Sequence, residues 1–314
     1  MQVADRIGAR IKLHDLHVLM TVVQTGSMSG AANLLNTTQP AISRSIGELE
    51  RAIGVRLLER NRRGVEPTRY GRALLDGGTA VFDDLRQAVK NIQFLAEPTA
   101  GEVRIGTSAV LAASFVSAIV SRLSRRYPRM SFHLQTGYME TLYQQLGERN
   151  VDLLIARRFS PGDDERLNFE LLFNEPFVVA AGAQNQWARR RRIELAELAN
   201  ESWVLPPQAS VIGSIVREAF RAGGLNYPRA TVVTDSPEAR LSLLTSGQFI
   251  TIFPASALQV PARRSDIKVL PVELPTALLP TEIVTLKDRA LSPPAQFFID
   301  CAREFAKQLA KRRR

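Results

Sequence analysis

The segment NTTQPAISRSIGELERAIG, residues 36–54, carries polar side chains at helical spacing. Residues four apart share a helix face, so Gln39, Ser43 and Gly47 form one row with Arg44 beside it. A guanidinium can form paired hydrogen bonds with guanine or hold a phosphate, and a carboxamide can pair with adenine. Because a glycine within a helix costs ~1 kcal/mol relative to alanine, Gly47 indicates a surface against which something fits closely. This chemistry suits contact with nucleic-acid bases.

A helix over this segment would position these side chains. Its buried stripe would contain residues that advance by four, three and four positions, namely Ile42, Ile46, Leu49 and Ile53. Thr38 would cap the helix, and Pro40 fits its first turn, where the missing N–H has no intrahelical partner to lose. Apolar spacing predicts an earlier helix over 13–23 and a short second helix that begins at Ser27 or Ser29. The prediction is a helix-turn-helix.

Two further elements follow this motif. Residues 55–68 read as a strand, a turn and a strand, with Arg62 and Arg63 at the tip. Such a basic tip can straddle phosphates or enter a minor groove, although a loop that only aids solubility is the alternative. Residues 70–95 then predict one long helix whose narrow apolar stripe suits pairing with a second copy. Pro98 and Gly101 mark the domain boundary.

The remainder alternates between segments typical of strands and of helices, beginning with a strand over residues 102–107 and a helix from Ser108 to Arg126. This pattern predicts α/β units with largely parallel sheets, arranged as two lobes with a cleft. Clefts form where strands lead into helices, and helix starts favour anionic or polyhydroxylated ligands. We expect a small carboxylate or a sugar acid as the ligand. Four such junctions carry small hydroxyl residues or suitable backbone: Thr107-Ser108, Met139-Glu140-Thr141, Gln208-Ala209-Ser210 and Asp235-Ser236-Pro237. Helix capping alone is the competing interpretation of these hydroxyl groups.

Composition narrows the class of protein. The 314 residues include 41 Lys and Arg against 31 Asp and Glu, a net charge of +10 that makes polyanions plausible partners. Cys301, the single cysteine, excludes an intrachain disulfide and fits a reducing compartment; we expect it in a core. The first residues are charged where a signal peptide needs an apolar run, and no 18-residue apolar stretch follows. We therefore predict a cytoplasmic protein without membrane contact.

Catalytic and metal-binding motifs are missing from the sequence. His14, His17 and His133 are scattered, with no Cys or acidic residue at metal-ligand spacing. Neither a Gly-x-Ser-x-Gly elbow nor a phosphate-binding loop occurs. The prediction is that the protein is not an enzyme and has no catalytic residue, no metal site and no cofactor.

A family resemblance extends these expectations. The segment SMSGAANLLNTTQPAISRSIGELERAIGVRLLERNRRGVEPTRYG, from Ser27, resembles the DNA-binding region of LysR-type transcriptional regulators. The later order of strands and helices resembles the effector domain of that family, which is similar to type 2 periplasmic binding proteins. LLERNRRGVEPTRYGRALL and PPQASVIGSIV look most like the branch that includes regulators of galactose-binding-protein and protocatechuate genes. Two positions depart from the family pattern: Leu58 replaces a more usual Phe, and Gly47 replaces a long polar residue.

The resemblance implies roles for particular residues. In DNA binding, Gln39, Pro40, Ser43 and Arg44 would approach the major groove, Ser27, Ser29 and Thr38 would touch phosphate, and Arg62 with Arg63 would form the wing. In effector binding, Ser108, Met139, Pro207 and Ser210 would contact the ligand, with Thr107 beside them and Tyr138 stacked on a ring or sugar face. The resemblance also implies homodimers on paired half-sites of double-stranded DNA and homotetramers joined through the effector domains. RNA polymerase is a further expected partner.

The expected fold is α/β with an N-terminal all-α winged helix-turn-helix and two α/β effector lobes. We predict DNA binding by residues 1–69, a dimerisation helix over 70–97 and an effector domain over 98–314. Within that domain, lobe I would comprise 98–174 and 276–314, and lobe II 175–275. Two other classes stay open. A solute-binding protein or enzyme of the same two-lobed fold would explain the last two-thirds of the chain, and a nucleoid-type protein would bind DNA without sequence preference.

Overall fold

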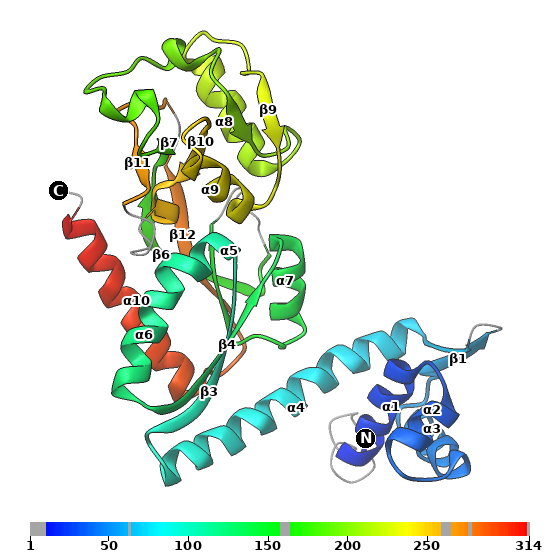
Figure 1. Cartoon of the computed structure of the whole chain (residues 1–314). Helices are drawn as coiled ribbons and strands as arrows, with labels where there is room; N and C mark the ends of the chain where they lie inside the picture. Colours follow the sequence, from blue (N-terminus) through cyan, green and yellow to red (C-terminus); the bar gives the residue numbers. More distant parts are fainter. Residues whose placement is uncertain (1–10, 62–63, 158–163, 259–264, 276–277, 313–314) are drawn as a thin grey trace. The chain divides into compact units, whose positions relative to one another are not determined.

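The computed structural model describes residues 11–61, 64–157, 164–258, 265–275 and 278–312 (Figure 1). The chain divides into two compact units, Met1–Val89 and Lys90–Arg314. The helix α4 (Arg69–Ala96) contains the boundary between them. We call them the N-terminal unit and the effector unit.

Three helices and a hairpin form the described part of the N-terminal unit, together with α4 up to Val89. They are α1 (Leu13–Thr25), α2 (Met28–Leu34), α3 (Gln39–Ile53), β1 (Leu58–Asn61) and β2 (Gly64–Pro67). The apolar stripe expected on α3 packs into a common core with α1 and α2, where Leu19, Ile42 and Leu49 are at most 1% exposed. Gly26 and Gly54 adopt the left-handed conformation that ends α1 and α3. The predicted helix-turn-helix is confirmed.

The turn into α4 is held by a threonine and a glycine. The Thr68 hydroxyl donates to the Arg56 carbonyl at 2.8 Å and accepts from the Gly71 N–H at 3.1 Å. A Cβ on Gly71 would lie 2.1 Å from the Leu57 carbonyl oxygen, so α4 can start here only with glycine at this position. These contacts give the Thr-x-x-Gly part of the sequence pattern a structural role.

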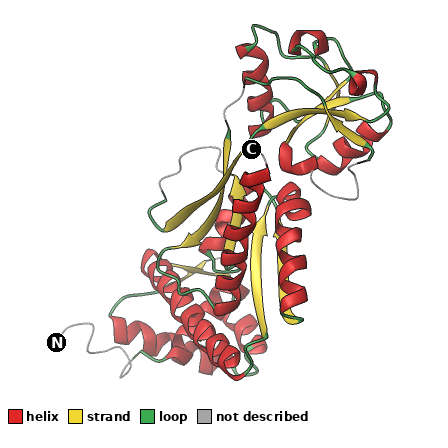
Figure 2. Cartoon of the chain, turned by 90° about the vertical axis from the view of Figure 1, so that its left-hand side faces the viewer, coloured by secondary structure: helices red, strands yellow, loops and turns green. Residues whose placement is uncertain are grey.

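The effector unit contains two five-stranded sheets, each flanked by helices (Figures 1 and 2). The first, in the order β4-β3-β5-β12-β6, consists of β3 (Ala100–Thr107), β4 (Arg129–Thr136), β5 (Leu153–Arg157), β6 (Leu167–Glu175) and β12 (Leu279–Leu286). The second, in the order β11-β7-β10-β8-β9, consists of β7 (Phe177–Gly182), β8 (Trp203–Leu205), β9 (Ala230–Val233), β10 (Ile250–Pro254) and β11 (Ile267–Val269). We call the two sheets with their helices lobe I and lobe II.

The helices follow the strands in chain order. They are α5 (Ala109–Leu111), the π turn η2 (Ala112–Val116), α6 (Ser117–Arg126), α7 (Met139–Gly147), α8 (Val211–Ala222), α9 (Pro237–Thr245) and α10 (Pro293–Arg312). The described part of the effector unit also contains the 3₁₀ turns η3 (Gln186–Arg189), η4 (Leu195–Leu198) and η5 (Ala255–Leu258). The two-lobed α/β architecture is confirmed.

Both sheets are mixed, so the expectation of largely parallel sheets was wrong. In lobe I, β3 is parallel to β4 and β5, but β12 is antiparallel to β5 and β6. In lobe II, β8 is parallel to β9 and β10, but β7 is antiparallel to β10 and β11. The reason is the path of the chain: β6 leads out of lobe I into lobe II and β12 leads back, so the two strands run in opposite directions.

Two local features also differ from the sequence interpretation. Strand β6 was not predicted, although Leu167, Phe169, Leu171 and Phe173 alternate along it as strand residues do. The helix expected from Ser108 to Arg126 is interrupted by the π turn η2. The Ser114 hydroxyl donates to the Val110 carbonyl at 2.7 Å, a side-chain bond that competes with the helical pattern.

Each lobe has its own apolar core. In lobe I, α6 and α10 pack on one face of the sheet, with Ile105, Ile119 and Phe298 fully buried. Cys301 lies in this core as expected, and burial raises the pKa of its thiol. In lobe II, Trp203 packs edge-on against Phe220 at a centroid distance of 5.5 Å.

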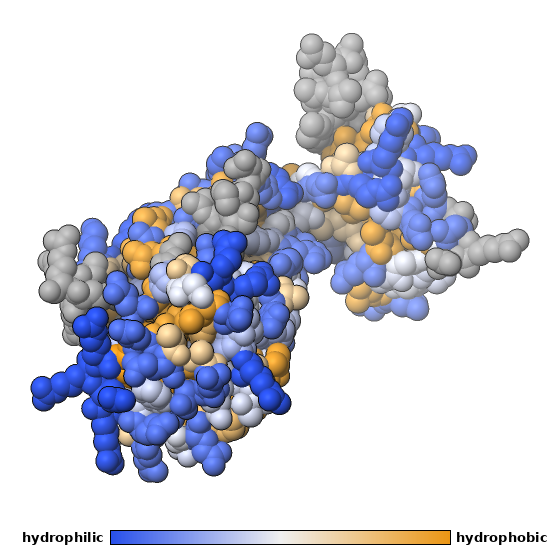
Figure 3. All heavy atoms as spheres, turned by 90° about the horizontal axis from the view of Figure 1, so that it is seen from above, coloured by the Kyte–Doolittle hydropathy of each residue, from blue (hydrophilic) through white to orange (hydrophobic). Residues whose placement is uncertain are grey.

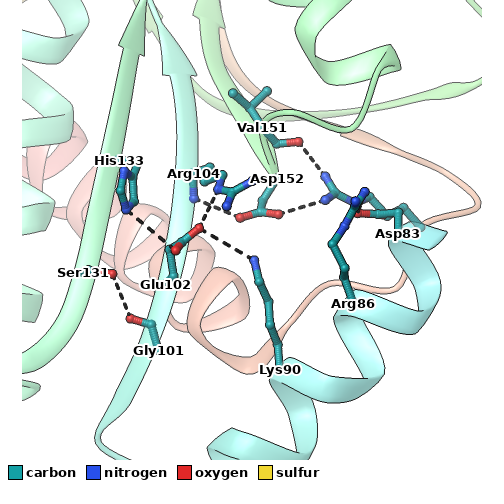
Figure 4. A network of polar contacts seen from close by, with 11 residues as sticks. Asp83, Arg86, Lys90, Gly101, Glu102, Arg104, Ser131, His133, Val151 and Asp152 are labelled. Atoms are coloured by element: carbon teal, nitrogen blue, oxygen red, sulfur yellow. Dashed lines mark hydrogen bonds and ion pairs between the residues drawn. The ribbon is translucent and has the colours of Figure 1, made fainter. Parts of the chain in front are cut away.

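Buried and half-buried charges brace lobe I (Figure 4). The Asp152 carboxylate accepts from the Arg104 backbone N–H at 2.8 Å and from the Arg289 guanidinium at 2.9 Å. The side chains of Asp152 and Arg289 are both buried. Glu102 lies near Arg104, Lys90 and His133 (Figure 4). Partial burial raises the pKa of Glu102, but the Arg104 hydrogen bond and the neighbouring cations outweigh it and lower the pKa.

Hydrophilic side chains cover most of the face of lobe II seen in Figure 3, with apolar side chains in small groups between them. None of the helices in the described ranges is long and apolar enough to cross a membrane.

Candidate DNA-binding surface and effector region

The polar row of α3 is open to solvent. Gln39, Pro40 and Arg44 are exposed, and Ser43 and Gly47 are half-buried. Within the part of the chain that the structure describes, the side chains of Gln39, Ser43 and Arg44 form no hydrogen bond or ion pair. On the opposite face, Ile42, Ile46 and Leu49 are buried. The helix therefore presents a guanidinium, a carboxamide and a hydroxyl with free hydrogen-bonding capacity.

A shallow hollow of about 140 Å³ lies beside this row. It is lined by Met28, Ser43, Ile46, Gly47, Glu50 and Leu58. A Cβ built on Gly47 meets no atom within 4 Å, so the glycine is not required by packing inside the protein. The absence of a side chain at this position leaves room on the outer surface of α3.

The expected phosphate-contacting residues at the helix starts have capping roles. The Ser27 hydroxyl accepts from the Gly30 N–H at 3.0 Å, and the Thr38 hydroxyl accepts from the Ala41 N–H at 3.4 Å. Ser29 is exposed inside α2. The cap of α2 is therefore Ser27, one of the two residues that the sequence left open.

The tip of the hairpin, with Arg62 and Arg63, lies outside the described residues. The strands that lead to it pair in antiparallel register from Leu58 opposite Pro67 to Asn61 opposite Gly64. The Val65 N–H donates to the Gly26 carbonyl at 2.9 Å, which attaches β2 to the end of α1. A Cβ on Gly64 would lie 2.6 Å from the same carbonyl oxygen, so glycine permits this close contact.

Three polar residues that support α3 were missed by sequence reasoning. The buried Ser45 hydroxyl donates to the buried Asp15 carboxylate at 2.7 Å and joins α3 to α1. A Glu50 carboxylate oxygen accepts from the backbone N–H groups of Leu57 at 2.7 Å and Leu58 at 3.2 Å. Ser45 could have been found, because it lies three residues after Ile42 and thus on the buried stripe.

From Val81 onward, α4 exposes apolar side chains. The exposed residues are Val81 (42%), Leu85 (45%), Val89 (53%), Ile92 (66%) and Leu95 (79%). They follow one another at intervals of four, four, three and three residues, which places them on one stripe of the helix. Five large exposed apolar residues in such a row are typical of a surface that binds another molecule.

In the effector unit, four of the predicted ligand-binding residues make contacts within their own lobe. The buried Thr107 hydroxyl donates to the Ile155 carbonyl at 2.7 Å, and the Ser108 hydroxyl accepts from the Leu111 N–H at 3.4 Å. The Ser210 hydroxyl donates to the Pro207 carbonyl at 2.6 Å and accepts from the Gly213 N–H at 3.0 Å. Ser108 and Ser210 thus serve as helix caps in this structure.

Tyr138 and Met139 differ from these four residues. Met139 is the first residue of α7 and packs on the apolar cluster beneath that helix. Tyr138 is 69% exposed, and its hydroxyl donates to the Asp235 carboxylate of lobe II at 2.6 Å. The hydrogen bond to Asp235 and the negative charge of that residue raise the pKa of Tyr138. This bond links lobe I to lobe II.

A buried ionic cluster at the connection between the lobes was also missed. Arg157, at the end of β5, donates from Nε to Glu175 at 2.9 Å and from Nη2 to the Ser256 hydroxyl at 3.0 Å. Glu175 is fully buried at the end of β6, two residues before β7, and also accepts from the Ser256 N–H. Ser256 belongs to η5 of lobe II. The cluster therefore connects both lobes through buried charge.

Comparisons with known proteins agree with this architecture. The profile of the bacterial regulatory helix-turn-helix protein, lysR family, matches residues 13–72, and that of the LysR substrate binding domain matches residues 96–307. The HTH-type transcriptional regulator GbpR of Azospirillum brasilense is 28% identical in sequence, and the match covers 92% of this chain and 85% of GbpR. PcaQ of Agrobacterium fabrum is 28% identical over 96% of this chain and 97% of its own.

Solved structures show the same fold. Full-length OxyR from Pseudomonas aeruginosa superposes with a TM-score of 0.64 at 22% sequence identity. The match covers 93% of this chain and 95% of the OxyR chain. CbnR, a LysR family transcriptional regulator, superposes with a TM-score of 0.55 at 22% sequence identity. The match covers 93% of this chain and 100% of the CbnR chain. CbnR has also been solved in complex with its target DNA.

The fold and the open surface of α3 define a DNA-binding regulator with an effector-binding region. The chain belongs to the LysR family of bacterial transcriptional regulators. It is a transcriptional regulator whose activity is modulated by an effector. A solute-binding protein is not supported, because the helix-turn-helix match and the regulator relatives include the first part of the chain.

Proposed function

We propose that α3 enters the major groove and distinguishes one base sequence from another. Gln39, Ser43 and Arg44 would contact base edges and nearby backbone, with Pro40 at the groove entrance. The observation that carries this proposal is that these three polar side chains have no partner in the described part of the chain. Arg44 would supply paired hydrogen bonds to guanine and Gln39 to adenine.

Other residues would hold the protein on the DNA backbone. Ser27, Ser29 and Thr38 lie at or near helix starts, where N–H groups and hydroxyls favour phosphate. Arg62 and Arg63 would act as the basic wing. The net charge of +10 supports contact with a polyanion. We assign DNA binding to residues 1–69 on these grounds.

The change Arg44→Ala tests this function. A preferred site is first selected from random duplexes with the wild-type protein, and the dissociation constants of both proteins are then measured at fixed salt. The loss of one bidentate base contact should weaken specific binding about 5- to 150-fold. The unfolding midpoint should not change, because the Arg44 side chain is exposed. The control is Arg221→Ala on α8, an exposed arginine of the effector unit.

Two results would contradict the proposal. One is an Arg44→Ala protein that binds the selected site as tightly and as selectively as the wild type. The other is a selection that enriches no sequence, which would favour a nucleoid-type DNA binder without sequence preference.

We propose that residues 70–97 form a dimerisation helix. The exposed stripe from Val81 to Leu95 supports pairing with a second copy, which would place two copies of α3 on paired half-sites. An aspartate in place of Val89 should prevent pairing, because the dimer would have to bury a charge. Sedimentation equilibrium measures this. Tetramers through the effector domains and contact with RNA polymerase are further parts of this proposal.

We propose that residues 98–314 bind a small carboxylate or a sugar acid at the junction of the two lobes. Thr107, Ser108, Met139, Pro207 and Ser210 lie at strand-to-helix junctions, and Tyr138 already bridges the lobes. Binding would alter how the lobes meet and so change how the paired domains are set on DNA. No catalytic step is part of this function, and the cytoplasm is its proposed location.

A further inference from the structure

Arg240 carries a buried charge that the protein does not neutralise. It lies in α9 of lobe II and is 4% exposed. Its Nη1 donates to the Ile252 carbonyl at 3.3 Å, and Nε has no hydrogen-bond partner in the described ranges. Among the described residues no carboxylate forms an ion pair with it. A guanidinium has five N–H donors, so this group is under-satisfied for its burial.

The surroundings of Arg240 stabilise the cation only weakly. The guanidinium carbon lies 4.4 Å from the centre of the Phe253 ring, a cation–π contact. Burial lowers the pKa of Arg240 to about 10, and the charges of Glu238 and Asp235 offset this only in part. Asp235 is already engaged with the Tyr138 hydroxyl. A buried cation without a counter-ion is destabilising, and an anionic ligand would supply the opposite charge that Arg240 lacks.

The position of Arg240 connects it to the junction of the lobes. In Figure 1, α9 lies on the side of lobe II that faces α5 and α7 of lobe I. Asp235, directly before α9, bonds Tyr138 of lobe I. The Phe253 ring, which lies against the Arg240 guanidinium, packs in an apolar cluster that also includes Val110 of lobe I. Arg240 therefore lies beside both of these contacts between the lobes.

Arg240 is bonded to a strand of the lobe II sheet. The pairing of β8 with β10 includes Ile250 opposite Trp203, and the Thr251 hydroxyl then donates to the Val204 carbonyl. The Ile252 carbonyl, further along β10, is reached by Arg240. The Arg240 side chain therefore reaches the backbone of β10 two residues beyond Ile250, the residue that pairs with β8.

We propose that Arg240 is the anion-binding residue of the effector site and that the effector carries a carboxylate or phosphate group. The anion would enter when the Tyr138–Asp235 contact opens and would accept hydrogen bonds from Nε and one Nη of the guanidinium. This proposal rests on the proposed effector function of residues 98–314, and it adds the residue that recognises the anionic group of the ligand.

The first test needs no ligand. In Arg240→Met an apolar side chain of similar length would replace the uncompensated charge and still cover Phe253. The unfolding midpoint of the full-length protein without added anion should rise by about 2–4 °C. A lower midpoint would overturn the proposal, because it would show that the charge serves internal packing. Arg221→Met, an exposed arginine on α8, is the matched control and should leave the midpoint unchanged.

The second test uses anions as probes. The midpoint is measured with benzoate, galactonate and inorganic phosphate, each against benzamide, galactose and potassium chloride at equal ionic strength. The wild-type protein should be stabilised by at least one anion and not by its neutral partner, and Arg240→Met should lose this stabilisation. A carboxylate response without a phosphate response, or the reverse, identifies the anionic group.

The outcomes separate this inference from the proposed effector function. If neutral and anionic probes stabilise both proteins equally, the effector function stands and the role of Arg240 is refuted. If no probe stabilises either protein, both the anion site and the proposed ligand class fail. If the anion response survives in Arg240→Met, the anion binds elsewhere and the proposal is wrong.

Discussion

Arg44 in the N-terminal unit and Arg157 in the effector unit use the same chemical group in opposite ways. Arg44 is exposed on α3, and no partner for it exists in the described residues. Arg157 is 6% exposed and engages Glu175 and Ser256. The serines show the same difference, because Ser43 has no hydrogen-bond partner among the described residues whereas Ser210 caps α8. The outer face of α3 leaves its polar groups available for a partner, whereas Arg157 and Ser210 use theirs to hold the effector unit together.

The largest effect that this comparison predicts is on stability. Arg157→Met would leave the carboxylate of Glu175 buried without its counter-ion and should cost about 3–5 kcal/mol of unfolding free energy. Chemical denaturation of the full-length protein measures this. The double variant with Glu175→Leu should recover most of the loss. A single variant as stable as the wild type would show that the cluster is not a structural support.

A pair of serine substitutions sharpens the contrast. Ser210→Ala removes a helix cap and should lower stability by about 1 kcal/mol. Ser43→Ala should change stability by less than about 0.5 kcal/mol. It should instead weaken binding to the selected DNA site about 2- to 10-fold, as expected for one hydrogen bond. Thermal unfolding and DNA titration of both variants are needed, and equal effects of the two changes on stability would break the comparison.

Gly47 tests whether the free face of α3 fits closely against DNA. Gly47→Ala should raise stability by about 0.5–1 kcal/mol, because the new methyl group meets no atom within 4 Å and the helix gains propensity. Binding to the selected site should weaken if the row is a close-fitting surface. Gly147→Ala in α7, where a Cβ also meets no atom within 4 Å, is the control. Unchanged DNA affinity in Gly47→Ala would disprove the close fit.

The smallest effect concerns the bond between the lobes. The pKa of Tyr138 is raised by its hydrogen bond to Asp235, so the bond stabilises the folded protein at neutral pH. This contribution is present below the ordinary tyrosine pKa and is lost as the pH rises through the raised value. The difference in unfolding midpoint between wild type and Tyr138→Phe should therefore shrink in alkaline solution. A difference that is independent of pH would show that packing, not the bond, is responsible.

Prediction from the sequence succeeded where the signals are local. Thr38, the spacing of Ile42, Ile46 and Leu49, and Gly54 were sufficient to predict α3, because caps and helical periodicity involve neighbours within a few residues. Prediction failed for the mixed sheets and for the π turn η2. Strand direction depends on the route of the whole chain between the lobes, and helix periodicity cannot reveal an extra residue in one turn.

The candidate sites divide in the same way. The residue types and spacing on α3 were enough to predict an exposed recognition face, since a side chain without an internal partner needs no tertiary contact to define its role. The roles of Arg157, Tyr138 and Arg240 were settled only by folding, because their contacts join segments that lie between 12 and 99 residues apart. Burial and pairing at such separations follow from how the two lobes pack, and a linear pattern of residue types does not contain that information.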